Sequence, residues 1–260
     1  MHKLLIQREK KEYVKELDRE VTITKRHEYF VSDIAKDFGT MHGTIKAKDL
    51  KAKDGSIVKS SQGTEFIVLS PTFPDMFKRI RKQAQTVMAK DLGLILAETG
   101  VGADSLAVDA GAGSGAMACF LARHVKKVVT YEIRDDFLEN VKANIKLLGL
   151  TNVTLKHGDI TKNVAEKNVD LFTLDLPEPW HTIPVVAKAL KVGGWLAGYC
   201  PHVSQVMQLA DAIRKDKRLQ LIKCVELIQR DWVVDAQRSR PDNRGVGHTA
   251  FLVFARKFQS

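Results

Sequence analysis

Short runs of alternating apolar and polar residues fill roughly the first 70 positions of the chain, with glycine and aspartate between them. This alternation is typical of short β-strands with one buried face. The stretch Pro71-Thr72-Phe73-Pro74 breaks the pattern and indicates a linker. We therefore expect a small N-terminal β domain over residues 1–72 and a second domain over residues 73–260. The strands expected in the first domain are Val21–Thr24, Tyr29–Val31, Ser56–Val58 and Glu65–Leu69.

From residue 106 onward, the pattern changes to strands that alternate with helices. Such alternation predicts a doubly wound, Rossmann-like α/β sheet. Two long β runs, Leu219–Val234 and His248–Lys257, close the chain, and we expect the last strand of the sheet to be reversed. The other expected strands are Leu106–Ala110, Lys127–Glu132, Val153–Asp159, Val169–Leu174 and Trp195–Tyr199, and the expected helices are Ala116–Ala122, Asp135–Leu148, Thr182–Leu190 and one that starts at Val203.

The first strand of this half leads directly into a glycine-rich turn, Gly111-Ala112-Gly113-Ser114-Gly115. Glycines let the backbone approach a ligand closely, and the free N–H groups at the start of the following helix point at that ligand. The turn lacks the third glycine of the dinucleotide motif, and the carboxylate of Asp109 would repel a pyrophosphate. A cationic cofactor such as S-adenosylmethionine therefore fits better than a nicotinamide dinucleotide. An ordinary glycine turn between a strand and a helix would show the same pattern.

Four acidic residues, Asp109, Glu132, Asp159 and Asp175, each stand at the carboxyl end of an expected strand. In an open α/β sheet, ligands bind at that edge. Glu132 follows Asp109 at about the ~20-residue spacing of a carboxylate that binds ribose hydroxyls, and Asp159 would face an adenine amino group. Asp175 opens the rigid loop D-L-P-E-P-W, residues 175–180. Any one of these acids alone is explained better as a helix N-cap or a surface turn, but all four together favour a binding site.

Length and charge narrow the class of protein. The 260 residues, of which 44% are hydrophobic and 28% charged, are typical of a soluble globular protein with one large and one small domain. The formal net charge of +10 suits either a polyanionic partner or a lysine-rich solvated surface. Four cations fall within Lys78-Arg79-Ile80-Arg81-Lys82. This run is either a phosphate-contacting segment at the mouth of the site or a solvated helical surface.

The distribution of cysteines and apolar residues bears on localisation. Cys119, Cys200 and Cys224 are scattered, which argues against a metal site and against a disulfide framework. The N-terminus lacks the apolar region of a signal peptide. Val192–Ala210 is uncharged, but its glycines, proline and polar residues indicate a strand, a loop and a helix rather than a membrane span. We expect a cytoplasmic protein with no membrane segment and no metal.

Taken together, several motifs resemble the tRNA (adenine-N1)-methyltransferases that modify adenine 58 in the T-loop, in their archaeal and bacterial homotetrameric form. The likeness extends over nearly the whole chain. The glycine turn is shared by many methyltransferases, whereas the loop D-L-P-E-P-W and the ending V-G-H-T-A-F-L-V are specific. The motifs are D-A-G-A-G-S-G-A from Asp109, Tyr131-Glu132-Ile133-Arg134, Gly158-Asp159-Ile160, Asp175–Trp180 and Gly247–Val253, with Gly39–Ile45 and Gly55–Lys59 in the small β domain.

This resemblance implies a class I S-adenosylmethionine-dependent α/β fold, a tRNA substrate, a homotetramer, and methylation at N1 of adenine 58, with adenine 57 as an open addition. It implies that Asp175 lies between the methyl donor and the target base and is the catalytic residue. It further implies that Asp109, Gly111, Gly113, Ser114, Gly115, Ala116 and Met117 wrap the methionine moiety, that Glu132 holds the ribose, that Asp159 and Ile160 hold the adenine, and that Gln85 closes the cofactor pocket.

Two residues need separate interpretation. Met88 stands where relatives have an aromatic or imidazole ring followed by proline, so its thioether would have to contact the target base instead. His248 lies in an apolar strand and is expected to be a structural or interface residue rather than a general base.

Other functions stay open at this point. The chain could be a catalytically silent tRNA-binding subunit, or a methyltransferase for a protein or a small molecule. The intact acids disfavour the first alternative, and the basic small domain with the loop D-L-P-E-P-W disfavours the second. A nicotinamide-dependent oxidoreductase fits least well.

Overall fold

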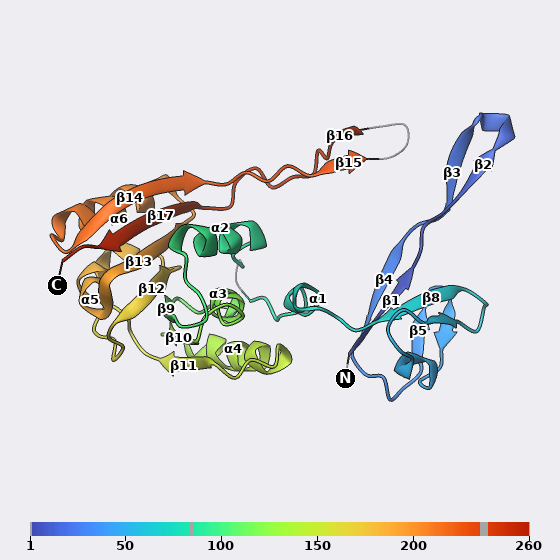
Figure 1. Ribbon diagram of the computed structural model, residues 1–260, viewed down its shortest axis with the longest axis horizontal. Coiled ribbons are helices and arrows are strands. Elements are labelled where there is room, and N and C mark those ends of the chain that lie inside the picture. The colour runs from blue at the N-terminus through green and yellow to red at the C-terminus, as the bar shows by residue number, and fades with distance from the viewer. Residues whose placement is uncertain (1, 84–85, 235–238, 260) are drawn as a thin grey trace. The chain divides into compact units, whose positions relative to one another are not determined.

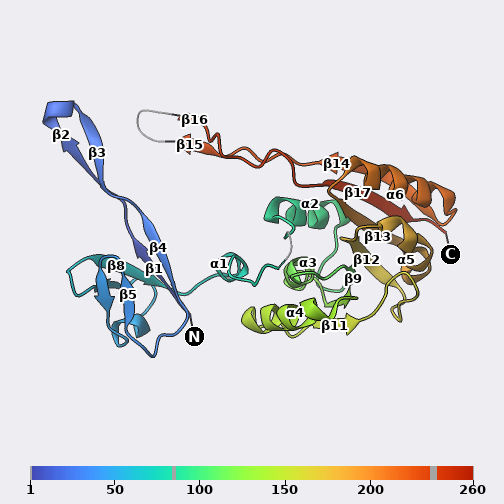
Figure 2. The ribbon, with the colours of Figure 1, turned by 180° about the vertical axis from the view of Figure 1, so that it is seen from behind.

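The computed structural model describes residues 2–83, 86–234 and 239–259 of the chain. It consists of two compact units, residues 1–78 and residues 79–260. The first unit contains the N-terminal strands, and the second contains an α/β sheet (Figures 1 and 2). The division lies shortly beyond the Pro71–Pro74 linker, after the short helix α1 (Phe73–Phe77).

The first unit is built around β1 (Lys3–Gln7), which pairs antiparallel with β4 (His27–Val31) on one side and with β8 (Glu65–Leu69) on the other. Strand β7 (Ile57–Lys59) extends this sheet beyond β8. The predicted small β domain is thus confirmed as a fold element. Two hairpins and two short 3-10 turns complete the unit: β2 (Lys10–Val14) with β3 (Arg19–Thr24), β5 (Phe38–Thr40) with β6 (Gly43–Ile45), Lys15–Leu17 and Asp49–Lys51.

The second unit contains a seven-stranded sheet in the order β11-β10-β9-β12-β13-β17-β14. Neighbouring strands are parallel except for β17, which is antiparallel to both β13 and β14. The predicted α/β sheet with a reversed last strand of the chain is confirmed. The strands are β9 (Leu106–Ala110), β10 (Lys127–Glu132), β11 (Val153–His157), β12 (Val169–Leu174), β13 (Leu190–Cys200), β14 (Leu219–Glu226) and β17 (Phe251–Lys257).

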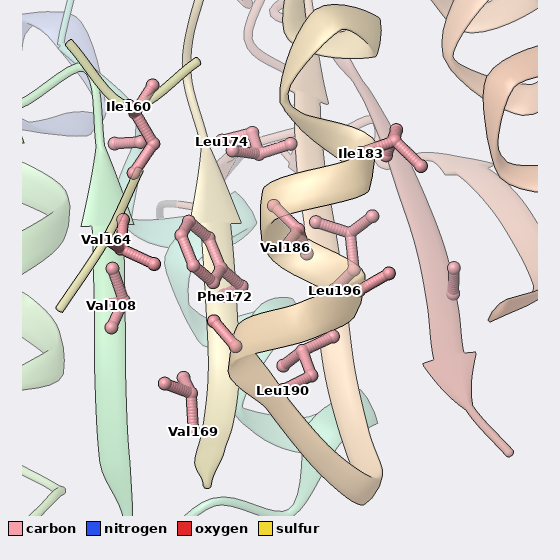
Figure 3. Packing of buried hydrophobic residues seen from close by; sticks show 14 of the residues in the cluster. Val108, Ile160, Val164, Val169, Phe172, Leu174, Ile183, Val186, Leu190 and Leu196 are labelled. Carbon is pink, nitrogen blue, oxygen red and sulfur yellow. The ribbon is translucent and has the colours of Figure 1, made fainter. Parts of the chain in front are cut away.

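Helices cover both faces of this sheet, with α2, α3 and α4 on one face and α5 and α6 on the other (Figures 1 and 2). A strand in the middle is therefore buried on both sides, which explains the nearly continuous apolar sequence of β12. Figure 3 shows Val186 of α5 packed near Phe172 of β12 and Leu196 of β13. The helices are α2 (Ala89–Thr99), α3 (Ala116–Leu121), α4 (Asp135–Leu147), α5 (Ile183–Ala189) and α6 (Val203–Lys215), with a 3-10 turn at Pro179–Thr182.

Both predicted terminal β runs are too long. Strand β14 ends at Glu226, where its pairing with β17 ends, and β15 (Trp232–Val234) pairs instead with β16 (Ser239–Pro241). Strand β17 begins at Phe251 rather than at His248. The apolar pattern extends beyond the C-terminal end of β14 and before the N-terminal end of β17. It cannot show where a strand loses its partner, because strand pairing is a tertiary property.

The basic run at residues 78–82 is not helical, because α1 ends at Phe77 and α2 begins at Ala89. The interpretation of this run as a helical surface is therefore wrong. The stretch from Val192 to Ala210 forms most of β13, a short loop and the first half of α6, as predicted. Among the helices that the structure describes, none is long and apolar enough to cross a membrane.

Candidate active site

The glycine turn follows β9 and reaches the end of the neighbouring strand β12. Gly111, Gly113 and Gly115 have φ angles of 86°, 53° and 76°, in the left-handed region that favours glycine. A Cβ atom at Gly111 would lie 2.0 Å from the carbonyl oxygen of Asp175. Only glycine at position 111 therefore allows the turn and the Asp175 backbone to approach each other this closely.

Asp109 lies behind this turn and is fully buried. It stands in register between Thr130 on β10 and Thr173 on β12, and each of these hydroxyls donates a 2.7 Å hydrogen bond to its carboxylate. Burial raises the pKa of Asp109 to about 6, although the two hydroxyls favour the ionised form. Asp109 thus links three strands directly below the turn.

Glu132 ends β10 and holds the glycine turn against that strand. Its carboxylate accepts hydrogen bonds from the backbone N–H groups of Gly113 at 2.8 Å, Ile133 at 3.0 Å and Arg134 at 3.0 Å. The side chain is buried, and three donors fix its orientation. Hydrogen bonds to an ionised acceptor are among the stronger ones in proteins, so Glu132 rigidifies the turn.

Asp175 follows β12 and faces the turn from the other side. Its backbone N–H donates to the carbonyl of Ala110 at 2.9 Å. The carboxylate is partly buried, and it has no hydrogen-bond partner among the residues that the structure describes. Burial raises the pKa of Asp175 to about 7, and repulsion from Asp109 contributes to this rise. The site therefore contains a carboxylate that ionises near neutral pH and is open to a partner.

Two cavities lie along this edge of the sheet. One, of about 390 Å³, lies over the glycine turn and includes Asp175; the other, of about 210 Å³, includes Asp159. Both are lined by Gly111, Glu132, Ile133, Leu176 and Pro177. Thr86, Val87, Ala112, Gly113, Ser114, Ala116, Met117, Arg134 and Phe137 complete the first, and Tyr131, Gly158, Ile160, Thr161, Glu178 and His181 complete the second.

Most of the residues predicted to bind the cofactor line these cavities. Asp109 and Gly115 line neither: Asp109 lies beneath the turn, and a Cβ at Gly115 would meet Val141 of α4 at 3.0 Å. Gln85 lies outside the described residues. Asp159 lines the second cavity, but its carboxylate also accepts hydrogen bonds from Thr161, which lower the pKa of Asp159. The alternative role given to these acids, stabilisation of a surface turn, therefore also applies to Asp159.

His248 connects its own segment to the end of β14 and to the loop after β13. Its Nδ1 lies 2.6 Å from Glu226 Oε1, and its Nε2 lies 2.9 Å from the Pro201 carbonyl oxygen. Both partners are acceptors, and together they raise the pKa of His248. A ring with both nitrogens engaged in this way has no free nitrogen to accept a proton, which agrees with the predicted structural role.

Other buried polar residues near the site were not singled out from the sequence. Gln205 of α6 donates to the carbonyls of Leu176 at 3.4 Å and Pro177 at 2.9 Å. Asn144 of α4 bonds to the glycine turn. Tyr199 is the next-to-last residue of β13, and burial raises its pKa to about 12, with the charges of Asp91 and Asp175 adding to the rise. The available signal was a polar residue on an otherwise apolar helix face, as for Asn144 after Phe137 and Val141.

The mostly parallel sheet with an antiparallel strand near its end, the glycine turn and the carboxylates beside it define a class I S-adenosylmethionine-dependent methyltransferase. A family model described as "tRNA methyltransferase complex GCD14 subunit" matches residues 65–240. The chain belongs to this family of tRNA (adenine-58-N1) methyltransferases, which includes the TrmI proteins. The resemblance noted in the sequence is therefore confirmed.

Individual relatives support this placement. The chain is 31% identical to the tRNA (adenine(57)-N(1)/adenine(58)-N(1))-methyltransferase TrmI of Methanocaldococcus jannaschii, over 88% of this chain and 90% of that protein. It is 30% identical to the tRNA (adenine(58)-N(1))-methyltransferase TrmI of Thermus thermophilus, over 81% of this chain and 84% of that protein.

Solved structures agree in fold. A protein described as an S-adenosylmethionine-dependent O-methyltransferase from Thermotoga maritima superimposes with a TM-score of 0.81 at 30% identity, covering 99% of this chain and 93% of its own. The tRNA (m1A58) methyltransferase TrmI of Aquifex aeolicus superimposes with a TM-score of 0.78 at 23% identity, covering 99% and 97%.

Proposed function

We propose that this protein transfers the methyl group of S-adenosylmethionine to N1 of adenine 58 in the T-loop of tRNA. The observation that carries the proposal is the Asp175 carboxylate, which lines the cavity over the glycine turn without a hydrogen-bond partner among the described residues. The M. jannaschii relative is named for adenine 57 as well as adenine 58, so both adenines are candidate targets.

The residues of the two cavities fit S-adenosylmethionine. This cofactor is a cation and supplies an electrophilic methyl group on a sulfonium. Gly111 and Gly113 line the first cavity without side chains of their own, and Asp175 offers a negative charge there. The second cavity combines the apolar Ile133 and Ile160 with Glu132 and Asp159, a lining suited to an adenine ring and ribose hydroxyls. We therefore assign the methionine end to the first cavity and the adenosine end to the second.

Asp175 has two roles in this mechanism. Adenine N1 already carries a lone pair, so no strong base is needed, and most of the acceleration comes from position and electrostatics. The carboxylate would accept a hydrogen bond from the exocyclic amine of the target adenine and so orient N1 toward the methyl donor. Bound S-adenosylmethionine would supply the methyl group, and the Asp175 carboxylate would stabilise the positive charge that methylation at N1 places on the adenine ring.

The target adenine is tucked into the folded T-loop, and its extraction costs a few kcal/mol. Exposed basic residues offset this cost through phosphate contacts. The candidates in the described part of the chain are the exposed Lys78, Arg79, Arg81 and Lys82, together with Arg240 and Arg244 beyond β15. Arg238, another basic residue of this stretch, is a further candidate and lies outside the described residues. The basic residues of the N-terminal unit are candidates as well.

We also propose a homotetramer in the cytoplasm. The tetramer rests on the family resemblance alone, and the cytoplasm on the tRNA substrate and three free cysteines. Met88 precedes the first turn of α2 and is 38% exposed. Its contact with the target base stays a prediction.

Asp175 also predicts a pH dependence. Its pKa of about 7 means that the carboxylate is largely protonated at lower pH. We expect kcat/KM for S-adenosylmethionine to rise about tenfold per pH unit up to about pH 7 and then to level off, because only the ionised form attracts the cation. Initial rates across this range measure the profile. In Asp175→Asn the residual single-turnover rate should no longer rise with pH in this range. A pH profile without this rise in the unaltered protein would contradict the role given to the Asp175 carboxylate.

Incubation of the purified protein with methyl-labelled S-adenosylmethionine and an unmodified tRNA transcript tests the proposed function. Nucleoside analysis should show 1-methyladenosine. tRNA binding without transfer would instead support a silent tRNA-binding subunit. Methylation of another class of substrate, with no product on tRNA, would support the protein or small-molecule alternative.

A further inference from the structure

Asn144 is a buried amide on the apolar face of α4. Phe137, Val141 and Asn144 are the buried residues of this helix, at the spacing of one helix face. Phe137 lines the first cavity, and Val141 lies directly behind Gly115. An uncharged polar side chain with no exposure is costly to bury unless each polar atom has a partner. The position of Asn144 therefore calls for a specific set of hydrogen bonds.

Asn144 makes three such bonds, to two separate segments. Its Oδ1 accepts from the backbone N–H of Arg81 at 2.7 Å, and its Nδ2 donates to the carbonyl of the same residue at 3.0 Å. The same Nδ2 donates to the carbonyl of Ser114 in the glycine turn at 2.8 Å. Asparagine combines this acceptor and these two donors in one short side chain.

The two segments have different tasks under the proposed function. Ser114 belongs to the turn that forms the first cavity. Arg81 belongs to the basic run, where its side chain and that of Lys82 are exposed while Ile80 beside them is buried. The same stretch of chain continues to Thr86 and Val87, which line that cavity. A single amide thus joins the cofactor turn to the segment that offers cations to RNA.

We propose that Asn144 is a positioning residue that couples the cofactor site to the tRNA-binding segment. The proposal rests on the proposed function for the identity of the two ligands. Order in the turn, imposed by the cofactor, is transmitted through the Asn144 amide to the backbone of Arg81, and order imposed by RNA returns by the same bonds. Binding of the two ligands is therefore mutually reinforcing, since such coupling is reciprocal.

Asn144→Ala tests this coupling, with Asn152→Ala as the matched control. Asn152 is also an amide clamp in the same unit, and its Nδ2 donates to the carbonyls of Ala122 at 2.8 Å and Val125 at 3.0 Å, away from both cavities. Calorimetry with S-adenosylhomocysteine measures cofactor-site affinity without tRNA. Titration with unmodified tRNA, with and without S-adenosylhomocysteine, measures the coupling, and thermal melts compare the stabilities.

For Asn144→Ala we expect about tenfold weaker binding of S-adenosylhomocysteine, as for residues that orient a binding site from behind. In this variant S-adenosylhomocysteine should no longer increase the affinity for tRNA. Asn152→Ala should lose stability without either change. If Asn144→Ala does not accumulate in folded form, Asn144→Ser, which keeps one donor, should show the same two losses in smaller measure. Equal ligand binding by the two alanine variants would overturn the proposal. An unaltered protein that binds S-adenosylhomocysteine but methylates no tRNA would overturn the proposed function, while the affinity comparison would still decide the role of Asn144.

Discussion

Replacing Asp175 with alanine will reduce the rate of methyl transfer by about a hundredfold to ten-thousandfold, with tRNA affinity unchanged. The carboxylate is the group that orients the exocyclic amine and stabilises positive charge on the ring, so its removal affects the transition state more than the bound substrate. Asp175→Asn should lose nearly as much, because the amide keeps the shape but not the charge. Single-turnover rates at saturating S-adenosylmethionine and tRNA, together with filter binding of tRNA, measure both quantities.

Asp170 provides the control for this experiment. It lies on the same strand, β12, where its carboxylate accepts from the backbone N–H of Leu106 at 2.7 Å and pairs with Lys191, away from both cavities. Asp170→Asn keeps an acceptor and should retain the rate of the unaltered protein. Transfer by Asp175→Ala within about tenfold of that rate would remove Asp175 from the mechanism.

Gly111→Ala will damage both stability and cofactor binding. The added Cβ would lie 2.0 Å from the carbonyl oxygen of Asp175, and alanine is also strained at a φ of 86°. We expect the free energy of unfolding to fall by about 1–3 kcal/mol. Because relief of the clash must move the Asp175 backbone by about 1 Å, the affinity for S-adenosylmethionine should fall by roughly a hundredfold. Chemical denaturation and calorimetry measure the two effects.

Gly149→Ala is the control that introduces backbone strain without a clash like the one between a Cβ at position 111 and the Asp175 carbonyl oxygen. Gly149 also has a positive φ, 63°, but apart from its chain neighbours no described residue has an atom within 4 Å of a Cβ there. This variant should lose about 1 kcal/mol of stability and keep its cofactor affinity. Equal cofactor affinity in the two variants would show that the contact between Gly111 and Asp175 does not shape the site.

The strand, turn and helix around the glycine motif could be predicted because their signals are local. Apolar runs, glycines and a carboxylate lie within a few residues of one another between Leu106 and Ala116. The sequence places all four strand-end acids at one ligand site, yet the structure gives them different neighbours. Asp109 faces two threonine hydroxyls beneath the turn, Glu132 binds three backbone N–H groups, and Asp175 is open to the cavity. Those differences depend on which strands are adjacent, and sequence spacing does not contain that information.

Two residues that contact the site, Asn144 and Gln205, could not be predicted from the sequence for the same reason. Asn144 and Gln205 each act on a backbone segment far away in the chain, residue 81 for one and residues 176–177 for the other. A polar residue on an apolar helix face indicates that a partner exists but not which segment supplies it. In the same way, the pattern from Leu219 to Val234 could not show that β17 stops pairing with β14 at Glu226.

The most direct measurement of the central claim is methyl transfer to two tRNA transcripts that differ only at position 58. One carries adenine there, the other guanine, and adenine 57 is replaced in both, so that position 58 alone is varied. The account predicts 1-methyladenosine at position 58 of the first transcript and no 1-methyladenosine in the T-loop of the second. Equal methylation of the two transcripts, or none of either by protein that binds S-adenosylmethionine, would contradict it.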